Sequence, residues 1–235
     1  MTPAPKSLAA LWSTPGWVEF YETRRGTTQD IYPSEWLFLK DLLVEGISVL
    51  DIGCAVGGLA SVLSEHLMRF DYTGVDLSKD IIERAKQKHP HHRFRVVGEA
   101  DLSVLADARY DLVVCLGVLH VNRRWRELIA AGWARTEQCF LFDLRETSGA
   151  TVEDETVSYF SVDTLLQTSV PARLPYNIIN TAEALRTLVD LCAGATGIQH
   201  YGYLADASPA AVTPTKQVFM NTYRIDKRPP RALLS

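Results

Sequence analysis

The sequence is poor in cysteine and has no long apolar run. The four cysteines of the 235 residues (Cys54, Cys115, Cys139 and Cys192) show no C-x-x-C spacing. Three of them lie within apolar patterns, which predicts buried free thiols in a reducing cytoplasm. No apolar run approaches the ~20 residues of a membrane helix. The segment Met1–Ala10 lacks the apolar core of a secretory signal. We therefore expect a cytoplasmic protein with no membrane span.

The sequence also lacks an excess of positive charge. It has 24 lysines and arginines against 28 aspartates and glutamates, a formal net charge of −4. Binding to nucleic acid phosphates requires a basic face, so this balance favours a small-molecule partner over RNA or DNA. The histidines His89, His91 and His92 surround Pro90 without matching cysteine or carboxylate spacing, so we expect no metal site.

One stretch organises the chain. Residues 49–52 form a short, mostly apolar run that contains Asp51 near its end. Glycines follow, and a periodic apolar segment then continues to Met68. This pattern predicts a buried parallel strand, a tight turn and a helix, the unit that binds nucleotides and related cofactors in open α/β sheets. A dinucleotide site would have glycine at 53, 55 and 58, but the middle position is Ala55. The alternative is a tight turn that binds no ligand.

Three further strands are each followed by a polar side chain or a glycine. Asp76 ends the second strand about twenty residues beyond the glycines, the distance at which a carboxylate binds ribose hydroxyls. The alternative is that Asp76 only caps a helix. The third strand is followed by Glu99 and Asp101, and the fourth by the run Leu-Gly-Val-Leu-His that ends at His120.

Together these motifs resemble class I S-adenosylmethionine (SAM) methyltransferases, a family that usually has glycine where this chain has Ala55. The resemblance covers residues 45–145 well. It implies that Asp101, or Glu99 in second place, meets the adenine amino group, and that Leu116 and Gly117 pass along the methionine part of the cofactor. The cofactor-binding residues that it implies are Asp51, Gly53, Cys54, Ala55, Gly57, Asp76, Leu77, Asp101, Leu102, Leu116 and Gly117.

The catalytic candidates are fewer. The resemblance directs His120 toward the substrate, where a histidine can take a proton near neutral pH. The alternative is a purely structural histidine that caps the next helix. Tyr32, Arg145 and Tyr159 are weaker candidates for substrate contact.

The predicted fold is α/β: a doubly wound, mostly parallel seven-stranded sheet with an antiparallel C-terminal strand and helices on both faces. We expect one domain over residues 1–235. It comprises an N-terminal helical arm (1–44), a cofactor-binding core (45–145), a substrate-covering insertion (146–180), and a closing helix with antiparallel strands (181–226). The aromatic residues of the arm could cover an active site or pack on the sheet, and packing is the favoured interpretation for most of them.

Two predicted helices carry polar residues of interest. Residues 35–44 form an apolar stripe with Ser34 as the expected N-cap. A second helix is expected over residues 122–136, with Arg123, Arg124 and Arg126 in its first turn. Three cations there oppose the helix dipole, which indicates either a solvated face, the favoured interpretation, or a nearby anionic group.

The predicted function is transfer of a methyl group from SAM to an oxygen, nitrogen or carbon of a small molecule, in metabolite, natural-product or saccharide biosynthesis. The expected mechanism is direct in-line displacement, for which the protein mainly supplies position and orientation. One alternative is an NAD(P)-dependent oxidoreductase, against which Ala55 and the antiparallel ending count. The other is a non-catalytic protein that binds SAM or S-adenosylhomocysteine (SAH). A homodimer is possible in either case.

Overall fold

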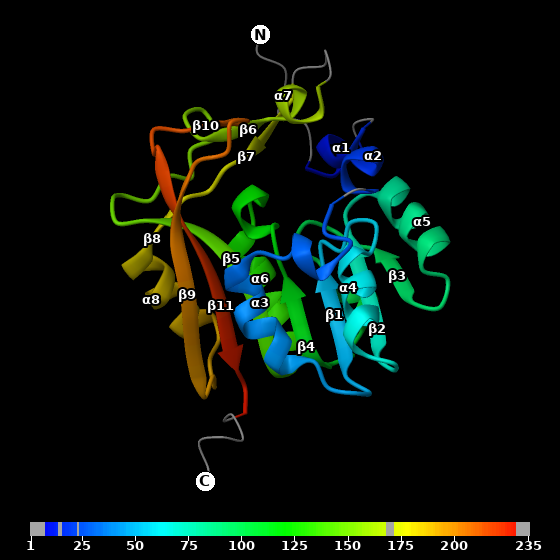
Figure 1. The fold of residues 1–235 in the computed structure, drawn as a ribbon. Helices are drawn as coiled ribbons and strands as arrows, with labels where there is room; N and C mark the ends of the chain where they lie inside the picture. Colours follow the sequence, from blue (N-terminus) through cyan, green and yellow to red (C-terminus); the bar gives the residue numbers. More distant parts are fainter. Residues whose placement is uncertain (1–7, 14–15, 23, 168–171, 229–235) are drawn as a thin grey trace.

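A computed structural model describes residues 8–13, 16–22, 24–167 and 172–228. Its main sheet has the strand order β3-β2-β1-β4-β5-β11-β9, and β8 pairs with the end of β5. The first five strands in this order, β3, β2, β1, β4 and β5, run parallel, whereas β11 is antiparallel to both of its neighbours. This arrangement confirms the predicted sheet and its antiparallel C-terminal strand (Figure 1). In sheet order the strands are β3 (Arg93–Val96), β2 (Asp71–Asp76), β1 (Ser48–Ile52), β4 (Tyr110–Cys115), β5 (Thr136–Thr147), β11 (Gln217–Asp226) and β9 (Gly197–Asp206), with β8 (Ile179–Asn180).

Helices cover both faces of this sheet. The helices are α1 (Leu8–Trp12), α2 (Trp17–Glu22), α3 (Pro33–Leu39), α4 (Gly58–His66), α5 (Lys79–Lys88), α6 (Trp125–Arg135), α7 (Val162–Leu166) and α8 (Thr181–Leu191). Short 3₁₀ helices add η1 (Thr28–Asp30), η2 (Lys40–Leu42), η3 (Ser103–Leu105) and η4 (Leu119–Val121). Apolar side chains of α6 and α8 pack with Leu50 of β1 on one face. Those of α3, α4 and α5 pack with Val49 on the other. Neighbouring residues of a strand point to opposite faces, so one buried strand supplies both cores.

The same alternation places charge beneath α3. In β5, Phe142 and Leu144 lie in the core that α6 and α8 cover. Asp143 and Arg145 therefore point to the opposite face, where α3 contacts β5 and β11. Both charged side chains are buried. An acid and a base two residues apart on a central strand thus form an ion pair within the fold. The sequence analysis named Arg145 as a candidate for substrate contact and did not predict this pair.

The insertion forms a second, three-stranded sheet that the sequence analysis did not predict. It contains β6 (Tyr159–Ser161) and β7 (Arg173–Pro175), joined by β10 (Ala211–Val212) from the connection between β9 and β11. Its apolar residues share one cluster with the N-terminal helices. Figure 1 shows the small sheet, α1 and α2 at the same end of the molecule. The missed strands have two or three residues each, too short to give a periodic pattern.

The predicted start of the helix at residues 35–44 is wrong. The helix begins at Pro33, Tyr32 is its N-cap, and the Glu35 carboxylate accepts the Tyr32 N–H at 3.1 Å. Proline at the first helical position and glutamate at the third fix this start. Ser34 is instead buried, and the Thr222 hydroxyl of β11 donates to its hydroxyl at 2.9 Å.

The predicted solvated face of the second helix holds for Arg124, which is exposed, and is wrong for Arg123 and Arg126. Because α6 begins only at Trp125, Arg123 precedes it and pairs with Glu155 of the insertion at 2.5 Å. Arg126 pairs with Glu153 at 2.7 Å. The alternative that an anionic group lies nearby is therefore correct, and the anions are carboxylates of the chain itself.

Gly58, the first residue of α4, lies against the N-terminal arm. A Cβ atom at this position would lie 2.3 Å from the backbone oxygen of Arg25. A contact under 3 Å with backbone cannot be relieved by rotating a side chain. The glycine at position 58 thus gives room for residues 24–25 to cross the start of α4.

We expect Gly58→Ala to lower the free energy of unfolding by about 1–3 kcal/mol, the usual cost of overpacking, although alanine favours helix. Urea unfolding measures it. Gly26→Ala is the matched control, because no atom lies within 4 Å of the Cβ built there. A Gly58→Ala protein as stable as the control would contradict the close approach.

Candidate functional site

A pocket opens at the carboxyl ends of β1, β2 and β4 and encloses, with its mouth, about 1140 Å³ of space. This is the edge where open α/β sheets bind their ligands. The turn after β1 lines it with Asp51, Gly53, Cys54 and Ala55. Of the other residues expected at the cofactor, it is lined by Asp76, Leu77, Leu116 and Gly117.

The turn after β1 depends on left-handed backbone. Gly53 has φ of 77°, and a Cβ there would lie 2.2 Å from Val118 in the loop after β4. Ala55 also has a positive φ, 47°, which costs a residue with a side chain about 1–2 kcal/mol. The related family usually has glycine at this position, and the backbone conformation gives the physical reason. Ala55 keeps the turn while adding a methyl group to the pocket wall.

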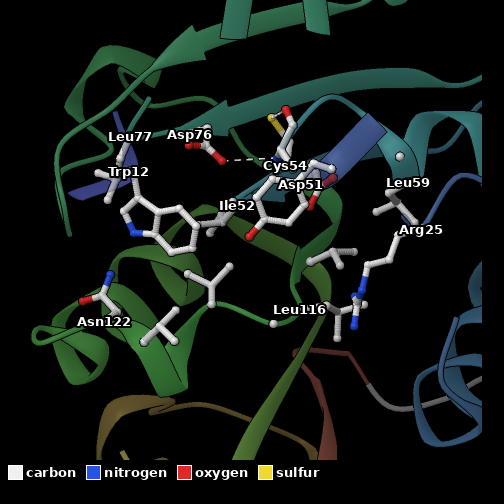
Figure 2. Close-up of a pocket in the computed structure, with 18 of the residues that line it drawn as sticks. Trp12, Arg25, Asp51, Ile52, Cys54, Leu59, Asp76, Leu77, Leu116 and Asn122 are labelled. Atoms are coloured by element: carbon white, nitrogen blue, oxygen red, sulfur yellow. Dashed lines mark hydrogen bonds between the residues drawn. The ribbon is translucent and has the colours of Figure 1, made fainter. Parts of the chain in front are cut away.

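Asp76 lies at one end of the pocket. Its carboxylate accepts the N–H of Ala55 at 3.2 Å and that of Ser78 at 3.0 Å. Figure 2 shows Trp12 and Leu77 beside it, with Arg25 and Leu116 at the other end. Burial raises the pKa of Asp76. Each carboxylate oxygen has one of these backbone donors and a further lone pair, so the group can accept two hydroxyl hydrogens as well.

Asp51 lies deeper, under the turn. The Tyr72 hydroxyl donates to its carboxylate at 2.6 Å. Burial raises the pKa of Asp51 to about 6, against the opposing effect of the Tyr72 hydrogen bond. This carboxylate therefore carries its charge at neutral pH within a largely apolar wall, and can attract the positive part of a ligand.

Of the two acids that follow the third strand, the pocket contains Glu99 and not Asp101. Glu99 lines it, whereas Asp101 is exposed and accepts the Ser103 N–H at 2.9 Å. Glu99 accepts the Arg123 N–H at 3.1 Å. Leu102 lies in the core under α6, and Gly57 is the N-cap of α4 outside the lining. Both acids lie in a turn in which the Asp101 N–H donates to the Gly98 oxygen at 3.4 Å, and spacing along the chain did not show which of them faces inward.

The N-terminal arm closes the pocket. Trp12, Tyr21 and Arg25 are part of its lining, although the sequence carried no motif for them. Trp17 instead packs in the core, as expected for most of the arm's aromatics, and its ring lies 4.4 Å from that of Trp12. Burial, with Asp76 as a second cause, raises the pKa of Tyr21, so this hydroxyl stays protonated. The only signal in the sequence was the density of aromatics in residues 12–21.

A charged cluster lies beyond Gly117. We define it as Arg25, Glu35, His120, Asp143 and Arg145. Asp143 accepts the Gly117 N–H at 2.5 Å and pairs with Arg145. Arg25 pairs with Glu35 at 2.8 Å. Burial raises the pKa of Glu35. Burial also acts to raise the pKa of Asp143, but Arg145, His120, the Gly117 N–H and Arg25 together outweigh it, so this pKa is lowered. The cluster holds two cations and two carboxylates.

His120 is the buried imidazole of this cluster. Its ring centroid lies 5.9 Å from those of Phe160 and Tyr176, both edge-on. Burial, and then the Arg145 charge, lowers the pKa of His120 to about 3, so the ring is neutral at pH 7. Its Nδ1 has no hydrogen-bond partner among the residues that the structure describes. His120 is outside the pocket lining, between Val118 and Val121, which both line it.

The other three catalytic candidates lie in different places. Tyr32 is partly exposed, and the Arg25 guanidinium lies 5.1 Å from its ring centroid. Arg145 is in the cluster itself. Tyr159 lies elsewhere: Arg173 lies 4.0 Å over its ring. Because the next residue in β6, Phe160, contacts His120, the side chain of Tyr159 points to the opposite side of the strand.

Within residues 8–13, 16–22, 24–167 and 172–228, no group of three or more histidine, cysteine, aspartate or glutamate side chains could hold a metal ion. None of the helices in those ranges is both long and apolar enough to cross a membrane.

Residues 50–135 match a family model described as a methyltransferase domain. The fatty-acid O-methyltransferase of Mycolicibacterium smegmatis is 28% identical over 166 residues, which cover 68% of this chain and 61% of that protein. The phthiotriol/phenolphthiotriol dimycocerosates methyltransferase of Mycobacterium tuberculosis is 29% identical over 150 residues, 62% of this chain and 55% of that protein. The chain thus spans about 60% or less of the length of these curated relatives.

Solved structures show the same fold. Magnesium protoporphyrin IX methyltransferase from Synechocystis PCC 6803 with bound SAM has a TM-score of 0.53 and 17% identity, and covers 82% of this chain and 75% of that chain. The N-terminal domain of EvdMO1 with SAH bound has a TM-score of 0.59 and 12% identity, over 81% and 78%. At these identities the likeness establishes the fold.

The low pKa of His120 predicts acid lability. Unfolding lets this imidazole regain its ordinary pKa of 6.5, so the unfolded state binds more protons and stability falls as the pH drops from 6.5 toward 3. Between pH 7 and pH 5 His120 should account for a loss of about 2 kcal/mol, which His120→Asn removes. Urea unfolding at both pH values measures the difference. Equal losses in the two proteins would contradict the prediction.

Proposed function

Residues 50–135 match a methyltransferase-domain model and the chain has the fold of SAM-binding methyltransferases, and from this premise we propose that it transfers a methyl group from SAM to a small-molecule acceptor. The observation that supports this most is the pocket itself. A glycine turn, a carboxylate on the next strand and the loop after β4 meet there at one sheet edge. A nucleoside-containing ligand requires this set of groups.

We assign the pocket residues as follows. Asp76 would accept both ribose hydroxyls, and Trp12 and Leu77 would enclose the adenine at the same end. Glu99, rather than Asp101, would accept the adenine amino group. Leu116 and Gly117 would pass along the methionine part.

The chemistry requires orientation more than acid–base catalysis. SAM, when bound, supplies a methyl group on a sulfonium, which is a good leaving group. The chain would hold the acceptor in line with that methyl group and exclude water through the N-terminal arm. With a pKa of about 3, His120 is suited to be a neutral hydrogen-bonding partner of the acceptor and is a poor general base. Arg145 and Tyr32 would complete the acceptor site, whereas Tyr159 would not touch it.

The proposal also covers the class of acceptor, the domain organisation, the cellular location and the oligomeric state. The relatives are named for a fatty acid, for phthiotriol dimycocerosates and, over only 83 residues, for trans-aconitate in Rhodopseudomonas palustris. These names and the net charge of −4 support a small metabolite over nucleic acid. We also propose one domain over residues 1–235 and a cytoplasmic location. A homodimer would suit β9, whose outer edge pairs with no strand of the described ranges.

We expect SAH to bind the purified chain and NADH not to bind. Asp76→Ala should weaken SAH binding by roughly 10–100-fold, because the ribose hydroxyls lose both of their acceptors. Calorimetry measures both. The exposed Asp107→Ala is the control for loss of one negative charge. The absence of SAH binding, or the binding of NADH instead, would refute the proposal. SAH binding without label transfer from SAM into a metabolite extract would favour a non-catalytic protein.

The two acids after the third strand can be separated in the same assay. Glu99→Ala should weaken SAH binding about tenfold, and Asp101→Ala by less than about twofold, because only Glu99 lines the pocket. An analogue whose adenine amino group is replaced by oxygen should bind equally to the Glu99→Ala and unsubstituted proteins. The reverse order of effects would return the adenine contact to Asp101.

A further inference from the structure

The pocket and the charged cluster meet at Gly117. The Arg25 guanidinium lies 3.9 Å from the position of a Cβ on this glycine. The Asp143 carboxylate binds its N–H. The side chain of Arg25 is 30% exposed, while that of its partner Glu35 is 1% exposed. Arg25 therefore presents its charge to the pocket at the end away from Asp76 (Figure 2).

Hydrogen-bond donors remain unused at this end. A guanidinium has five N–H donors, and in the described part of the chain Arg25 uses one of them, toward Glu35. His120 has only 8% of its surface exposed, and its Nδ1 has no hydrogen-bond partner among the described residues. A buried ring nitrogen without a partner costs free energy until something binds to it.

On the premise of the proposed function, we propose that the methyl acceptor is a carboxylic acid. Its carboxylate binds between Arg25 and the Nδ1–H tautomer of His120 and is methylated on oxygen to give an ester. Arg25 is then the residue that selects the acceptor by charge, and His120 orients the attacking oxygen.

The transfer to a carboxylate also removes charge from the site. Within the cluster, Glu35 offsets Arg25 and Asp143 offsets Arg145. The sulfonium is positive and the acceptor carboxylate is negative, and both products, a thioether and an ester, lack these two charges, which aids their release.

The reaction is complete without a proton acceptor. A lone pair of the carboxylate oxygen forms the new O–CH₃ bond, the C–S bond breaks, and its electron pair stays on sulfur. No proton is removed, whereas an alcohol must lose one. His120, with a pKa of about 3, would be poor at removing that proton. Burial also raises the pKa of Tyr176 and of Tyr203, so neither is a base at neutral pH.

The walls near Arg25 indicate what the rest of the acid is like. Leu59 and Leu116 line the pocket on that side, and both are apolar (Figure 2). An apolar wall beside Arg25 suits a carboxylic acid with an apolar body.

The first test compares acids with alcohols of the same carbon skeleton. The unsubstituted chain and SAM are incubated with straight-chain and aromatic monocarboxylic acids and with the matching primary alcohols, and SAH release is measured. We expect release with acids only, without acidification of a weakly buffered solution. Methylation of an alcohol in preference to its acid overturns the proposal. If none of the acids is turned over and none binds to the SAH complex by calorimetry, the proposal is also overturned.

The second test examines Arg25. Arg25→Met should weaken binding of the acid to the SAH complex roughly 10–100-fold and leave SAH affinity nearly unchanged. Arg25→Lys keeps the charge and should regain part of the loss. The control, Arg186→Met, removes an exposed arginine on α8. An equal loss of SAH affinity in Arg25→Met would assign Arg25 to the cofactor and overturn its role here.

The third test examines His120. His120→Asn should raise the KM for the acid more than it lowers kcat, because the ring orients the acceptor and exchanges no proton. A fall in kcat alone that follows the titration of a base would contradict this role. If SAH itself does not bind, the proposed function fails. If SAH binds and the acids do not, only the acceptor proposal fails.

Discussion

The buried carboxylate of Asp143 connects the parts of this site. It accepts the N–H of Gly117 and pairs with Arg145, so the end of β5 holds the loop after β4 in place. A carboxylate on a central strand requires compensation, because an unpaired buried charge is unstable. Arg145 provides that compensation, and the same guanidinium lowers the pKa of His120. One ion pair thus holds the backbone that borders the pocket, and its cation adds to the effect of burial, which is the main cause of the low pKa of His120.

The pocket combines two sources of structure. The sheet edge supplies the turn after β1, Asp76 and the loop after β4, and these follow from the strand order. The N-terminal arm supplies Trp12, Tyr21 and Arg25. The arm reaches the pocket because it crosses the start of α4 at a glycine. The groups proposed for the nucleoside therefore come mostly from the sheet, and those proposed for the acceptor come from the arm and from β5.

The sequence predicted the sheet, its antiparallel strand and most of the cofactor side of the pocket, because these depend on local patterns. An apolar run followed by glycines, or an acid at a strand end, is visible within ten residues. The acceptor side was harder to predict. Arg25 meets Glu35 through a bend of the arm. The orientation of Glu99 and Asp101 depends on a turn at Gly98, and the small sheet has strands of two or three residues. Each of these required three-dimensional contacts that no local pattern encodes.

The small sheet joins two distant parts of the chain, since β10 comes from the connection between the last two long strands and pairs with β6 of the insertion. Phe160 of β6 contacts the His120 ring directly. A change of length in the β9–β11 connection can therefore reshape the wall behind His120 while the nucleoside side keeps its form. Evolution, or an engineer, could alter the choice of acceptor by exchanging this hairpin with β6 and β7 as one module.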